Sequence, residues 1–308
     1  MSIELLRGKK LLLTGGTGFF GKSILDKIGR DASLGCDLTV LSRNPDAFKL
    51  NYPHLAKLSR LSFIAGDIRE FSVPKSHYDF IIHAACPTGH WPAGLQADII
   101  LKGSERILDF ARQCGVQKIL FISSGEVYGL QPATLARIPE SLPCRPSSEY
   151  GIAKRQAELM FAASPVPASI ARCFTFIGRY LDLNSHFAAA NFMDSCQRGK
   201  DIIIHSDGSP LRSYLYADDL VDWLLALLLK GKNSQPYNVG SENAWSILQL
   251  AQQIRAAYGG NNKIIVQNKE KGKNALARYI PSTRKIRSEL GVKESFSLEE
   301  AIRLAIKQ

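Results

Sequence analysis

The stretch KKLLLTGGTGFFG, residues 9–21, decides the fold predicted for this chain of 308 residues. Its apolar run predicts a buried strand, and the glycines predict a tight turn into a helix over residues 22–28. A side chain at Gly15 would obstruct the turn, and a Cβ at Gly18 would hold the backbone away from a bound pyrophosphate. Gly21 lets helix and strand pack closely. Because free N–H groups at the helix start would then face phosphates, we predict a dinucleotide-binding turn.

Apolar strand-like runs alternate with helical patterns after this turn. Such alternation predicts an α/β fold with a parallel, doubly wound sheet and right-handed crossovers, in which ligands bind beyond the carboxyl ends of the strands. Further strands are predicted at 38–41, 61–64, 80–83, 118–122 and 169–171, and the clearest helices at 100–114 and 150–163.

The formal net charge is +11, but the basic residues are scattered along the chain. We find no basic helix and no basic-aromatic motif typical of nucleic-acid binding, so we expect no nucleic-acid partner. A basic protein equally suits a small polyanionic ligand such as a nucleoside diphosphate.

The six cysteines show no CxxC spacing, which favours reduced thiols in a cytoplasmic protein, and no ligand pattern predicts a metal. Residues 1–10 are charged and do not resemble a signal peptide. The apolar run at 223–229 is far too short to span a membrane and predicts a buried helix. We expect no membrane association.

The end of the second strand bears on the choice of cofactor. An acidic residue there would bind the adenosine ribose hydroxyls and select NAD, but the sequence is Ser42-Arg43-Asn44. The small Ser42 and the guanidinium of Arg43 suit a 2′-phosphate, so we favour NADP over NAD. The alternative is that Arg43 is a solvated loop residue.

Two further strand ends lie where the cofactor is expected. Asp67 and Ile68 follow the third strand, and Asp67 could accept a hydrogen bond from the adenine amino group or merely cap a turn. Ala84 and Ala85 follow the fourth strand, and their small side chains leave room for the cofactor. We interpret His83 as a packed core histidine.

The predicted chemical centre combines the end of the fifth strand with the helix that follows it. The strand runs into Ser124, and Tyr150 and Lys154 lie four residues apart on one helix face. An ammonium beside a phenol favours the phenolate and lowers its pKa. A phenolate can take a proton from a sugar hydroxyl while hydride leaves the same carbon for a nicotinamide, and Ser124 can bind that oxygen.

These motifs resemble the extended short-chain dehydrogenases/reductases of the nucleotide-sugar epimerase/dehydratase group over nearly the full length. The resemblance rests on residues 14–21, 83–85, 123–129, 207–219 and 237–240, with Tyr150 and Lys154. It implies a Rossmann domain at 1–172, with a return segment near 211–235, and a smaller nucleotide-sugar-binding lobe at 173–308. It also implies a homodimer formed by the helices at 100–114 and 150–163.

The predicted sites follow from the residues and the resemblance together. The cofactor is expected against Gly15, Gly18, Phe19, Phe20, Gly21, Ser42, Arg43, Asp67, Ile68, Ala84, Ala85, Tyr150 and Lys154. Catalysis is assigned to Ser124, Glu126, Tyr150 and Lys154. Substrate contacts are assigned to Ser124, Gly125, Glu126, Thr175, Asn191, Arg212 and Arg278. An ion pair with Asp218 or Asp219 is the alternative for Arg212.

Departures from the family pattern at two positions limit the reaction. Dehydratases of the group carry an Asp where this chain has Gly125, and a glycine cannot protonate a departing hydroxyl. Decarboxylases share Glu126 but usually have a hydroxyl residue in place of Gly125. Thr175 stands where the family usually has Asn. C4 epimerases and 4-ketoreductases need only Ser124, Tyr150 and Lys154.

We therefore predict an enzyme that oxidises or reduces C4 of the hexose in a nucleoside-diphosphate sugar, of epimerase type. The alternatives are an NADPH-dependent 4-ketosugar reductase, then a dehydratase or decarboxylase. The usual setting of such enzymes is bacterial surface polysaccharide synthesis. Outside this class, a non-catalytic dinucleotide sensor or RNA-associated scaffold would be expected to lose Tyr150 or Lys154, and both are present.

Overall fold

The fold is organised around a seven-stranded parallel sheet with the order β11-β6-β5-β4-β1-β2-β3. The computed structural model describes residues 2–31, 34–72, 76–87, 92–267 and 277–307. The strands are β1 (Lys10–Thr14), β2 (Asp37–Ser42), β3 (Leu61–Ala65), β4 (Phe80–His83), β5 (Lys118–Ser124), β6 (Ala168–Cys173) and β11 (Pro236–Val239). The strand order reverses between β1 and β4, which is where a doubly wound sheet binds its ligand. The predicted α/β fold class is confirmed.

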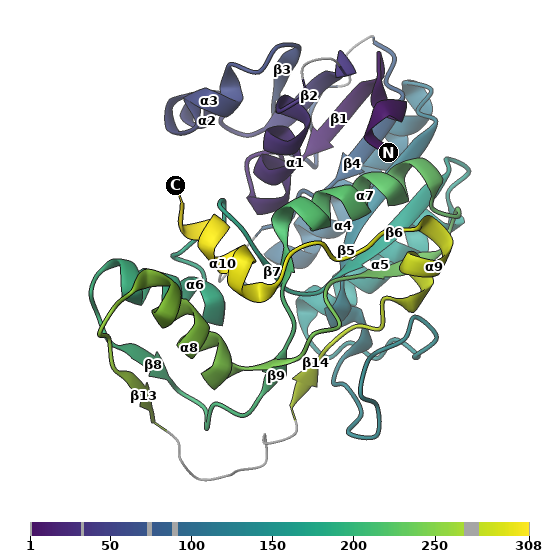
Figure 1. Ribbon diagram of the computed structural model, residues 1–308. Helices are drawn as coiled ribbons and strands as arrows, with labels where there is room; N and C mark the ends of the chain where they lie inside the picture. Colours follow the sequence, from purple (N-terminus) through teal and green to yellow (C-terminus); the bar gives the residue numbers. More distant parts are fainter. Residues whose placement is uncertain (1, 32–33, 73–75, 88–91, 268–276, 308) are drawn as a thin grey trace.

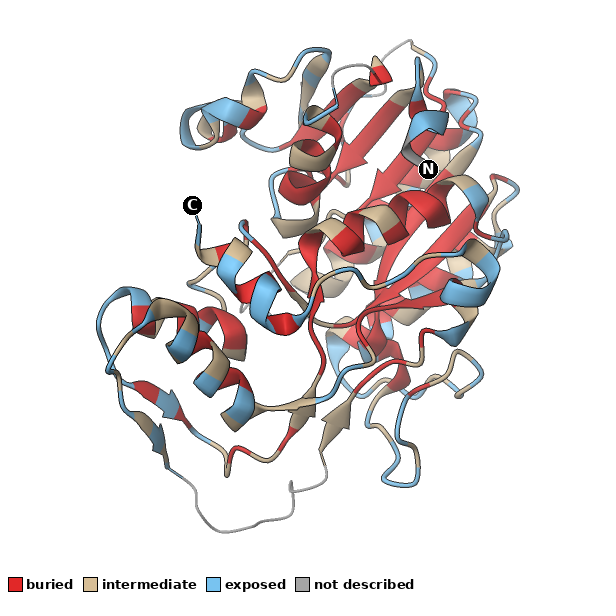
Figure 2. Cartoon of the chain, viewed as in Figure 1, coloured by how far each residue is buried: buried red, intermediate tan, exposed pale blue. Residues whose placement is uncertain are grey.

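Helices cover both faces of this sheet (Figure 1). One face carries α1 (Phe19–Gly29) and α7 (Ala217–Lys230), and the other carries α4 (Leu95–Gln113) and α5 (Glu149–Ala163). Successive side chains of β1 enter different cores: Leu11 and Leu13 pack with α1 and α7, whereas Leu12 packs with α4 and α5. Burial on both faces explains why the inner strands are mostly continuous apolar runs, and Figure 2 shows them as buried. The edge strand β3 is only partly buried.

Shorter elements complete this half of the molecule. A 3-10 turn η3 (Gly125–Tyr128) continues β5, and α9 (Arg284–Leu290) packs against β11. The remaining elements are η1 (Ser2–Leu6), α2 (Pro45–Asn51) and α3 (Pro53–Ala56).

A second lobe lies beside the carboxyl ends of the sheet strands and has its own apolar core. Phe192, Met193, Leu250, Ile254 and Ile302 are buried in that core. The helices of this half are α6 (Ala188–Gln197), α8 (Ile247–Tyr258) and α10 (Leu298–Ile306). Its short strands are β7 (Phe176–Ile177), β8 (Ile202–Ile204), β9 (Leu211–Arg212), β10 (Leu215–Tyr216), β12 (Trp245–Ser246), β13 (Ile264–Val266) and β14 (Arg278–Tyr279).

Three boundaries differ from the sequence predictions. α4 begins at Leu95, earlier than predicted, because Gly94 adopts a left-handed conformation (φ 78°) that precedes the first turn. β11 was not predicted as a strand, although it pairs with β6. The segment that returns to the sheet therefore extends to Val239. The apolar run at 223–229 lies in α7 as predicted, and among the described residues no helix is long and apolar enough to cross a membrane.

Candidate active site

The glycine turn between β1 and α1 lies at the point where the strand order reverses. Gly15 has φ 69°, and a Cβ there would lie 2.5 Å from the Ala84 carbonyl oxygen. A Cβ at Gly21 would lie 2.2 Å from the Cα of Gly16, so helix and turn are in direct backbone contact. A Cβ at Gly18 would meet only the Gly15 carbonyl oxygen, at 3.5 Å, and otherwise open space.

The N-terminus of α1 borders that open space. Gly18 is its N-cap residue and supplies no side-chain cap. First-turn N–H groups without a cap, at the positive end of the helix dipole, suit an anion. These residues therefore fit the pyrophosphate of a dinucleotide.

His83 joins the ends of β1 and β4 as a core residue. Its Nδ1 lies 2.8 Å from the Thr14 Oγ1, and the Ala85 N–H donates to the same Thr14 oxygen (3.2 Å). Its ring stacks on Phe121, and burial together with the charge of Lys154 lowers the His83 pKa to about 3. His83 is therefore neutral and structural, as the sequence indicates.

The end of β2 carries the small side chain and the basic side chain on which the prediction of NADP rests. Ser42 is buried, and its Oγ accepts a hydrogen bond from the Asn44 N–H (3.2 Å), while Arg43 is exposed. Asn44 caps α2 through its side-chain oxygen, which accepts from Ala47 N (3.0 Å). The described residues include no acidic side chain at this strand end.

Asp67 is tied into a short ion-pair chain. Its Oδ1 accepts hydrogen bonds from the Nε and the backbone N–H of Arg69, both at 2.9 Å, and Arg69 also reaches Asp98 (3.0 Å). The hydrogen bonds from Arg69 are the main cause of its lowered pKa, and Arg43 contributes a small part. Ile68 is buried against Gly103 of α4. The role of Asp67 in capping a turn is therefore observed, and its contact with adenine remains a prediction.

Helix α5 carries the predicted catalytic pair. Its N-cap is Ser148, whose Oγ accepts from the Gly151 N–H (3.0 Å) and donates to the Glu126 carboxylate (2.7 Å). Lys154 is buried, donates to the Ile122 carbonyl of β5 (2.8 Å) and lies 5.8 Å from the centre of the Tyr150 ring. Ser148 was not among the predicted site residues, although a serine just before a helical pattern is an N-cap signal.

The pKa of Tyr150 differs in direction from the prediction. We expected Lys154 to lower it, but burial raises it well above the ordinary value of a phenol. A hydrogen bond with Ser124 acts in the opposite direction, and the nearby Cys86, Tyr279 and Glu126 add to the rise. Lys154 is not among the groups that shift the Tyr150 pKa, and its ammonium donates to the Ile122 carbonyl.

A buried ion pair holds α5 against β5 and β6. Glu158 lies one turn beyond Lys154, and its carboxylate accepts from Arg172 Nε (2.9 Å) and Nη2 (2.8 Å). The same carboxylate accepts from the Ser123 hydroxyl (2.7 Å) and Arg155 (2.8 Å). Glu158 is fully buried and Arg172 nearly so. Ser123 directly precedes Ser124, so the Glu158–Arg172 pair holds the end of β5 and helix α5 together.

Gly125 faces an aromatic side chain from the distant segment β14. A Cβ at Gly125 would lie 2.4 Å from the Tyr279 hydroxyl oxygen and 2.9 Å from Phe174 Cζ. The Tyr279 and Phe174 rings are 4.6 Å apart. Sequence reasoning did not assign Tyr279, because only the pairing of β14 with β9 brings it here.

The other predicted substrate residues lie on the second half of the chain. Arg212 and Arg278 are on the paired strands β9 and β14, and the Arg212 guanidinium lies 6.0 Å from the Tyr279 ring centre. Asn191 is exposed on α6, and the Thr175 hydroxyl donates to the Ser213 carbonyl. An ion pair of Arg212 with Asp218 or Asp219 is not observed in the described part of the chain.

Those two aspartates are engaged elsewhere. Asp218 pairs with Arg30 (2.7 Å), and Asp219 accepts from the backbone N–H groups of Ser295 (2.8 Å) and Phe296 (3.3 Å). The alternative that we considered for Arg212 is therefore wrong, and its guanidinium instead lies over the Tyr279 ring.

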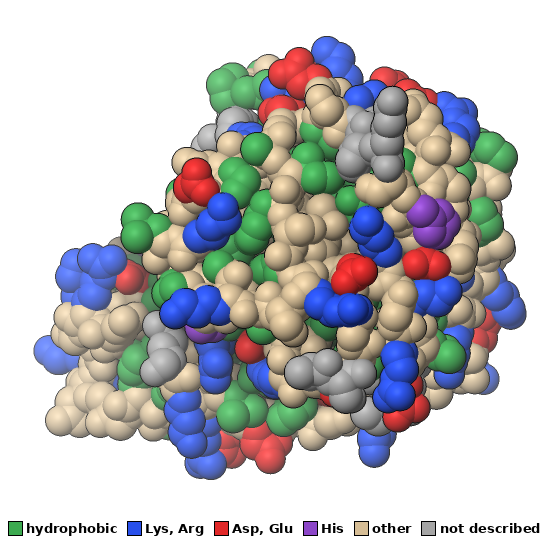
Figure 3. Space-filling model, turned by 90° about the horizontal axis from the view of Figure 1, so that it is seen from above, with side chains coloured by type: hydrophobic (Ala, Val, Ile, Leu, Met, Phe, Trp, Pro, Cys, Tyr) green, Lys and Arg blue, Asp and Glu red, His purple; other side chains and the backbone are tan. Residues whose placement is uncertain are grey.

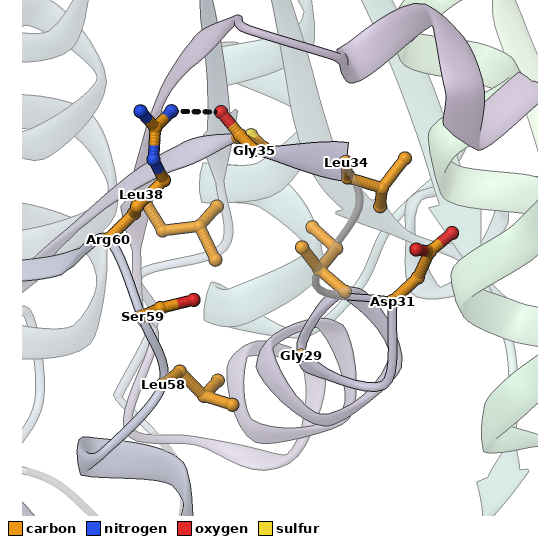
Figure 4. A pocket seen from close by; sticks show the side chains of 10 residues that line it. Gly29, Asp31, Leu34, Gly35, Leu38, Leu58, Ser59 and Arg60 are labelled. Atoms are coloured by element: carbon orange, nitrogen blue, oxygen red, sulfur yellow. Dashed lines mark hydrogen bonds between the residues drawn. The ribbon is translucent and has the colours of Figure 1, made fainter.

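A small pocket of about 50 Å³ lies at the opposite end of the sheet, between the end of α1 and the starts of β2 and β3 (Figure 4). Gly29, Leu34, Leu38 and Leu58 line it, and Arg60 closes one side by donating to the Gly35 carbonyl. Its volume is far below that of a dinucleotide site. Basic side chains do not gather in one patch on the face drawn in Figure 3, where acidic side chains lie among them.

Comparison with known proteins gives one family. The model described as "NAD dependent epimerase/dehydratase family" matches residues 11–240. Among curated proteins, UDP-glucuronic acid decarboxylase 1 of Xenopus tropicalis is 28% identical over 311 residues, covering 97% of this chain and 71% of that protein. dTDP-D-glucose 4,6-dehydratase of Bos taurus is 26% identical over 259 residues, covering 80% of this chain and 72% of that protein.

Solved structures share the fold. UDP-glucose 4-epimerase of Thermotoga maritima, with UDP-glucose, has a TM-score of 0.82 at 24% identity and covers 97% of both chains. UDP-glucuronic acid 4-epimerase of Bacillus cereus, in complex with NAD, has a TM-score of 0.82 at 20% identity, covering 96% of this chain and 94% of the other. These similarities run through both halves of the chain.

Proposed function

This chain belongs to the NAD dependent epimerase/dehydratase family, and we propose that it inverts C4 of the hexose in a nucleoside-diphosphate sugar. Enzymes of this family use a nicotinamide dinucleotide, and we propose such an enzyme here in place of a non-catalytic sensor or RNA-associated scaffold. The observation that carries the proposal is the grouping of Ser124, Tyr150 and Lys154, with no acidic side chain at Gly125.

In this proposal the chain's own residues handle the proton at the C4 oxygen. Tyr150 Oη takes the proton of the C4 hydroxyl and returns it after inversion, while Ser124 Oγ holds the same oxygen. The bound nicotinamide would accept hydride from C4 and return it to the opposite face. Burial raises the pKa of Tyr150 and so favours the protonated phenol. In this proposal the side chain of Lys154, four residues later on the same helix, favours the phenolate during hydride transfer.

Position 125 separates the proposed reaction from dehydration. Loss of a hydroxyl from the carbon chain of the sugar needs a proton donor beside it, and Gly125 offers none. The space that a side chain would occupy there is filled by Tyr279 and Phe174. Oxidation and reduction at C4 need no such donor.

A decarboxylase is the second candidate. It is favoured by Glu126 and by the similarity to the Xenopus tropicalis UDP-glucuronic acid decarboxylase. A C4 ketone beside a C5 carboxylate can lose carbon dioxide without an acid at position 125. An NADPH-dependent 4-ketosugar reductase would use the same three residues but would consume its cofactor.

We propose NADP as the preferred cofactor, because Ser42 and Arg43 stand where an acidic residue would select NAD. Arg43 is exposed at the carboxyl end of β2 and can turn toward a 2′-phosphate. The Bacillus cereus epimerase described above is in complex with NAD, so this preference would set the chain apart from that protein.

The assembly and setting belong to the same proposal. Ile152 and Leu159 on α5 are 43% and 53% exposed and lie on the helix that contacts α4, which supports a homodimer through these helices. We also propose a boundary near residues 172 and 173 between the cofactor and substrate halves. A cytoplasmic location and a role in polysaccharide synthesis complete the proposal.

The deciding experiment uses the purified holoenzyme with UDP-glucose and UDP-glucuronic acid as probes. Products are identified by proton NMR while cofactor absorbance is followed. The proposal predicts the C4 epimer with no net change in cofactor. Release of carbon dioxide would identify a decarboxylase, and loss of water would identify a dehydratase. Net consumption of NADPH with a 4-ketosugar would identify a reductase. Each of these three results would contradict the proposal.

A further inference from the structure

Glu126 contacts both of the elements that carry Ser124 and Tyr150. It lies in η3, the turn that continues β5. Its backbone N–H donates to Ser124 Oγ at the end of β5 (3.1 Å). Its carboxylate accepts a hydrogen bond from the hydroxyl of Ser148, the N-cap residue of α5 (2.7 Å). One residue therefore bridges Ser124 and the first turn of the helix that carries Tyr150.

The main chain of Glu126 also lies against that first turn. A Cβ at Gly151 would lie 2.9 Å from the Glu126 carbonyl oxygen and 3.1 Å from Ser148 Oγ, so any side chain at position 151 would crowd this contact. Tyr150 stands between Ser148 and Gly151 in the chain. Contacts with Glu126 therefore hold the backbone on both sides of Tyr150.

The Ser148 hydroxyl supplies both a donor and an acceptor at this junction. A serine has one hydroxyl hydrogen, which here goes to the Glu126 carboxylate, while a lone pair accepts from the Gly151 N–H (3.0 Å). A hydrogen bond to a carboxylate is charge-assisted, and a negative charge beside a helix N-terminus is also favoured by the helix dipole. These contacts use the Glu126 carboxylate as an acceptor and need no proton transfer to it.

We infer that Glu126 is a positioning residue whose carboxylate, held by the Ser148 hydroxyl, sets Tyr150 in place relative to Ser124. This inference rests on the proposed function, because Tyr150 and Ser124 are the residues proposed to act on the C4 oxygen. Inversion by hydride transfer at C4 needs no second base, so the carboxylate of Glu126 is free for this role.

The first test separates an acceptor from a base at position 126. Glu126→Gln keeps a side-chain oxygen that can accept from Ser148, but an amide does not take up a proton. In the holoenzyme with UDP-glucose, Glu126→Gln should lower kcat by no more than about 3-fold, whereas Glu126→Ala should lower it about 10-fold with little change in KM. A loss of about 10²-fold or more with Glu126→Gln would identify a base and overturn the inference. Wild-type kcat in Glu126→Ala would overturn it as well.

The second test separates hydrogen-bond donation by Ser148 from its capping of α5. Ser148→Asp keeps an oxygen for the Gly151 N–H, but it cannot donate and places a second carboxylate beside Glu126. It should lower kcat about 10-fold. Ser148→Thr keeps both the donor and the cap and should retain kcat. A Ser148→Asp enzyme as fast as Ser148→Thr would overturn the inference.

Ser297 provides a matched control at a helix of the other lobe. It caps α10 by accepting from the Glu300 N–H (3.2 Å), and its hydroxyl donates to the Glu300 carboxylate (2.8 Å). Ser297→Ala and Ser148→Ala should lower the melting temperature to a similar extent, because each removes one cap. Only Ser148→Ala should lower kcat. Equal kcat values for the two alanine variants would overturn the inference.

A readout without turnover separates this inference from the proposed function. In crystal structures, Ser148→Asp should turn the Glu126 side chain away and move Tyr150 relative to Ser124 by about 0.5 Å or more, compared with the wild type. If the wild type turns over no nucleotide sugar, the proposed function fails while this comparison still decides. The same position of Tyr150 relative to Ser124 in both structures would overturn the inference.

Discussion

The glycine turn and the catalytic helix border the same site but are held in place by different means. The turn is fixed by backbone contact: Gly15 against the Ala84 carbonyl, and Gly21 against Gly16. Helix α5 is fixed by side chains, chiefly the buried Glu158–Arg172 pair. Contacts between main chains leave a local trace in the sequence as glycines at fixed spacing. Contacts between distant side chains leave none.

The largest effect should come from breaking the side-chain anchor. Glu158→Gln removes a carboxylate that pairs with Arg172, Arg155 and Ser123. Leaving the Arg172 charge buried without its partner should lower the free energy of unfolding by about 3–5 kcal/mol. Chemical denaturation measures this change.

Glu299→Gln is the matched control for that substitution. Glu299 pairs with Arg303 on the exposed surface of α10, with both side chains more than half exposed. Its loss should change the free energy of unfolding by less than about 1 kcal/mol. Equal effects of the two substitutions would show that the buried pair does not anchor α5.

A smaller effect on stability, with a loss of cofactor binding, should follow from filling the glycine turn. Gly15→Ala places a Cβ 2.5 Å from the Ala84 carbonyl oxygen in a backbone with φ 69°. Crowding and strain together should cost about 2–4 kcal/mol. Denaturation and dinucleotide titration by calorimetry measure both effects.

Gly8→Ala separates strain from crowding. Gly8 has φ 66°, but a Cβ there would meet nothing within 4 Å. Its cost should therefore be the backbone term alone, about 1 kcal/mol, with cofactor binding retained. If Gly8→Ala were as costly as Gly15→Ala, backbone contact with β4 would not be what fixes the turn.

The smallest effect should come from the exposed Arg43. Arg43→Ala should weaken NADP binding about 10-fold, because a charge-assisted hydrogen bond to the 2′-phosphate is lost. NAD binding should be unchanged, and calorimetric titration of each cofactor measures the two affinities. Equal losses for both cofactors would show that Arg43 does not recognise the 2′-phosphate.

The sequence predicted those parts of the fold whose pattern is local. Six strands of the sheet could be predicted from continuous apolar runs, and the four-residue spacing of Tyr150 and Lys154 predicted that they share one face of a helix. Both predictions succeed because periodicity records burial over a few residues. β11 was not predicted, because its four residues begin with a proline and include the polar Asn238. Asn238 is buried because its side chain donates to the Ile138 and Ser282 carbonyls, which are far away in the chain.

The residues of the candidate site also fall into two groups: those that a local motif identifies and those that only distant contacts bring into place. Gly15, Ser124, Tyr150 and Lys154 could be named from motifs. In a doubly wound sheet Gly15 and Ser124 lie at the same edge, at the carboxyl ends of β1 and β5, which have β4 between them, and α5 carries the other two. Tyr279 could not be named from a motif, because it reaches Gly125 through a two-residue strand whose partner is β9. The direction of the Tyr150 pKa shift could not be predicted from the sequence, since its main cause is burial, with smaller contributions from Cys86 and other neighbours that the fold brings together.

The central claim is that hydride leaves and returns at C4 with Tyr150 handling the proton. UDP-glucose deuterated at C4, incubated with the holoenzyme and analysed by NMR and mass spectrometry, tests it most directly. The account predicts the C4 epimer with deuterium retained at C4, a slower rate than with the unlabelled sugar, and a loss of about 10²-fold or more with Tyr150→Phe. An epimer that has lost its deuterium to solvent, or full activity of Tyr150→Phe, would contradict it.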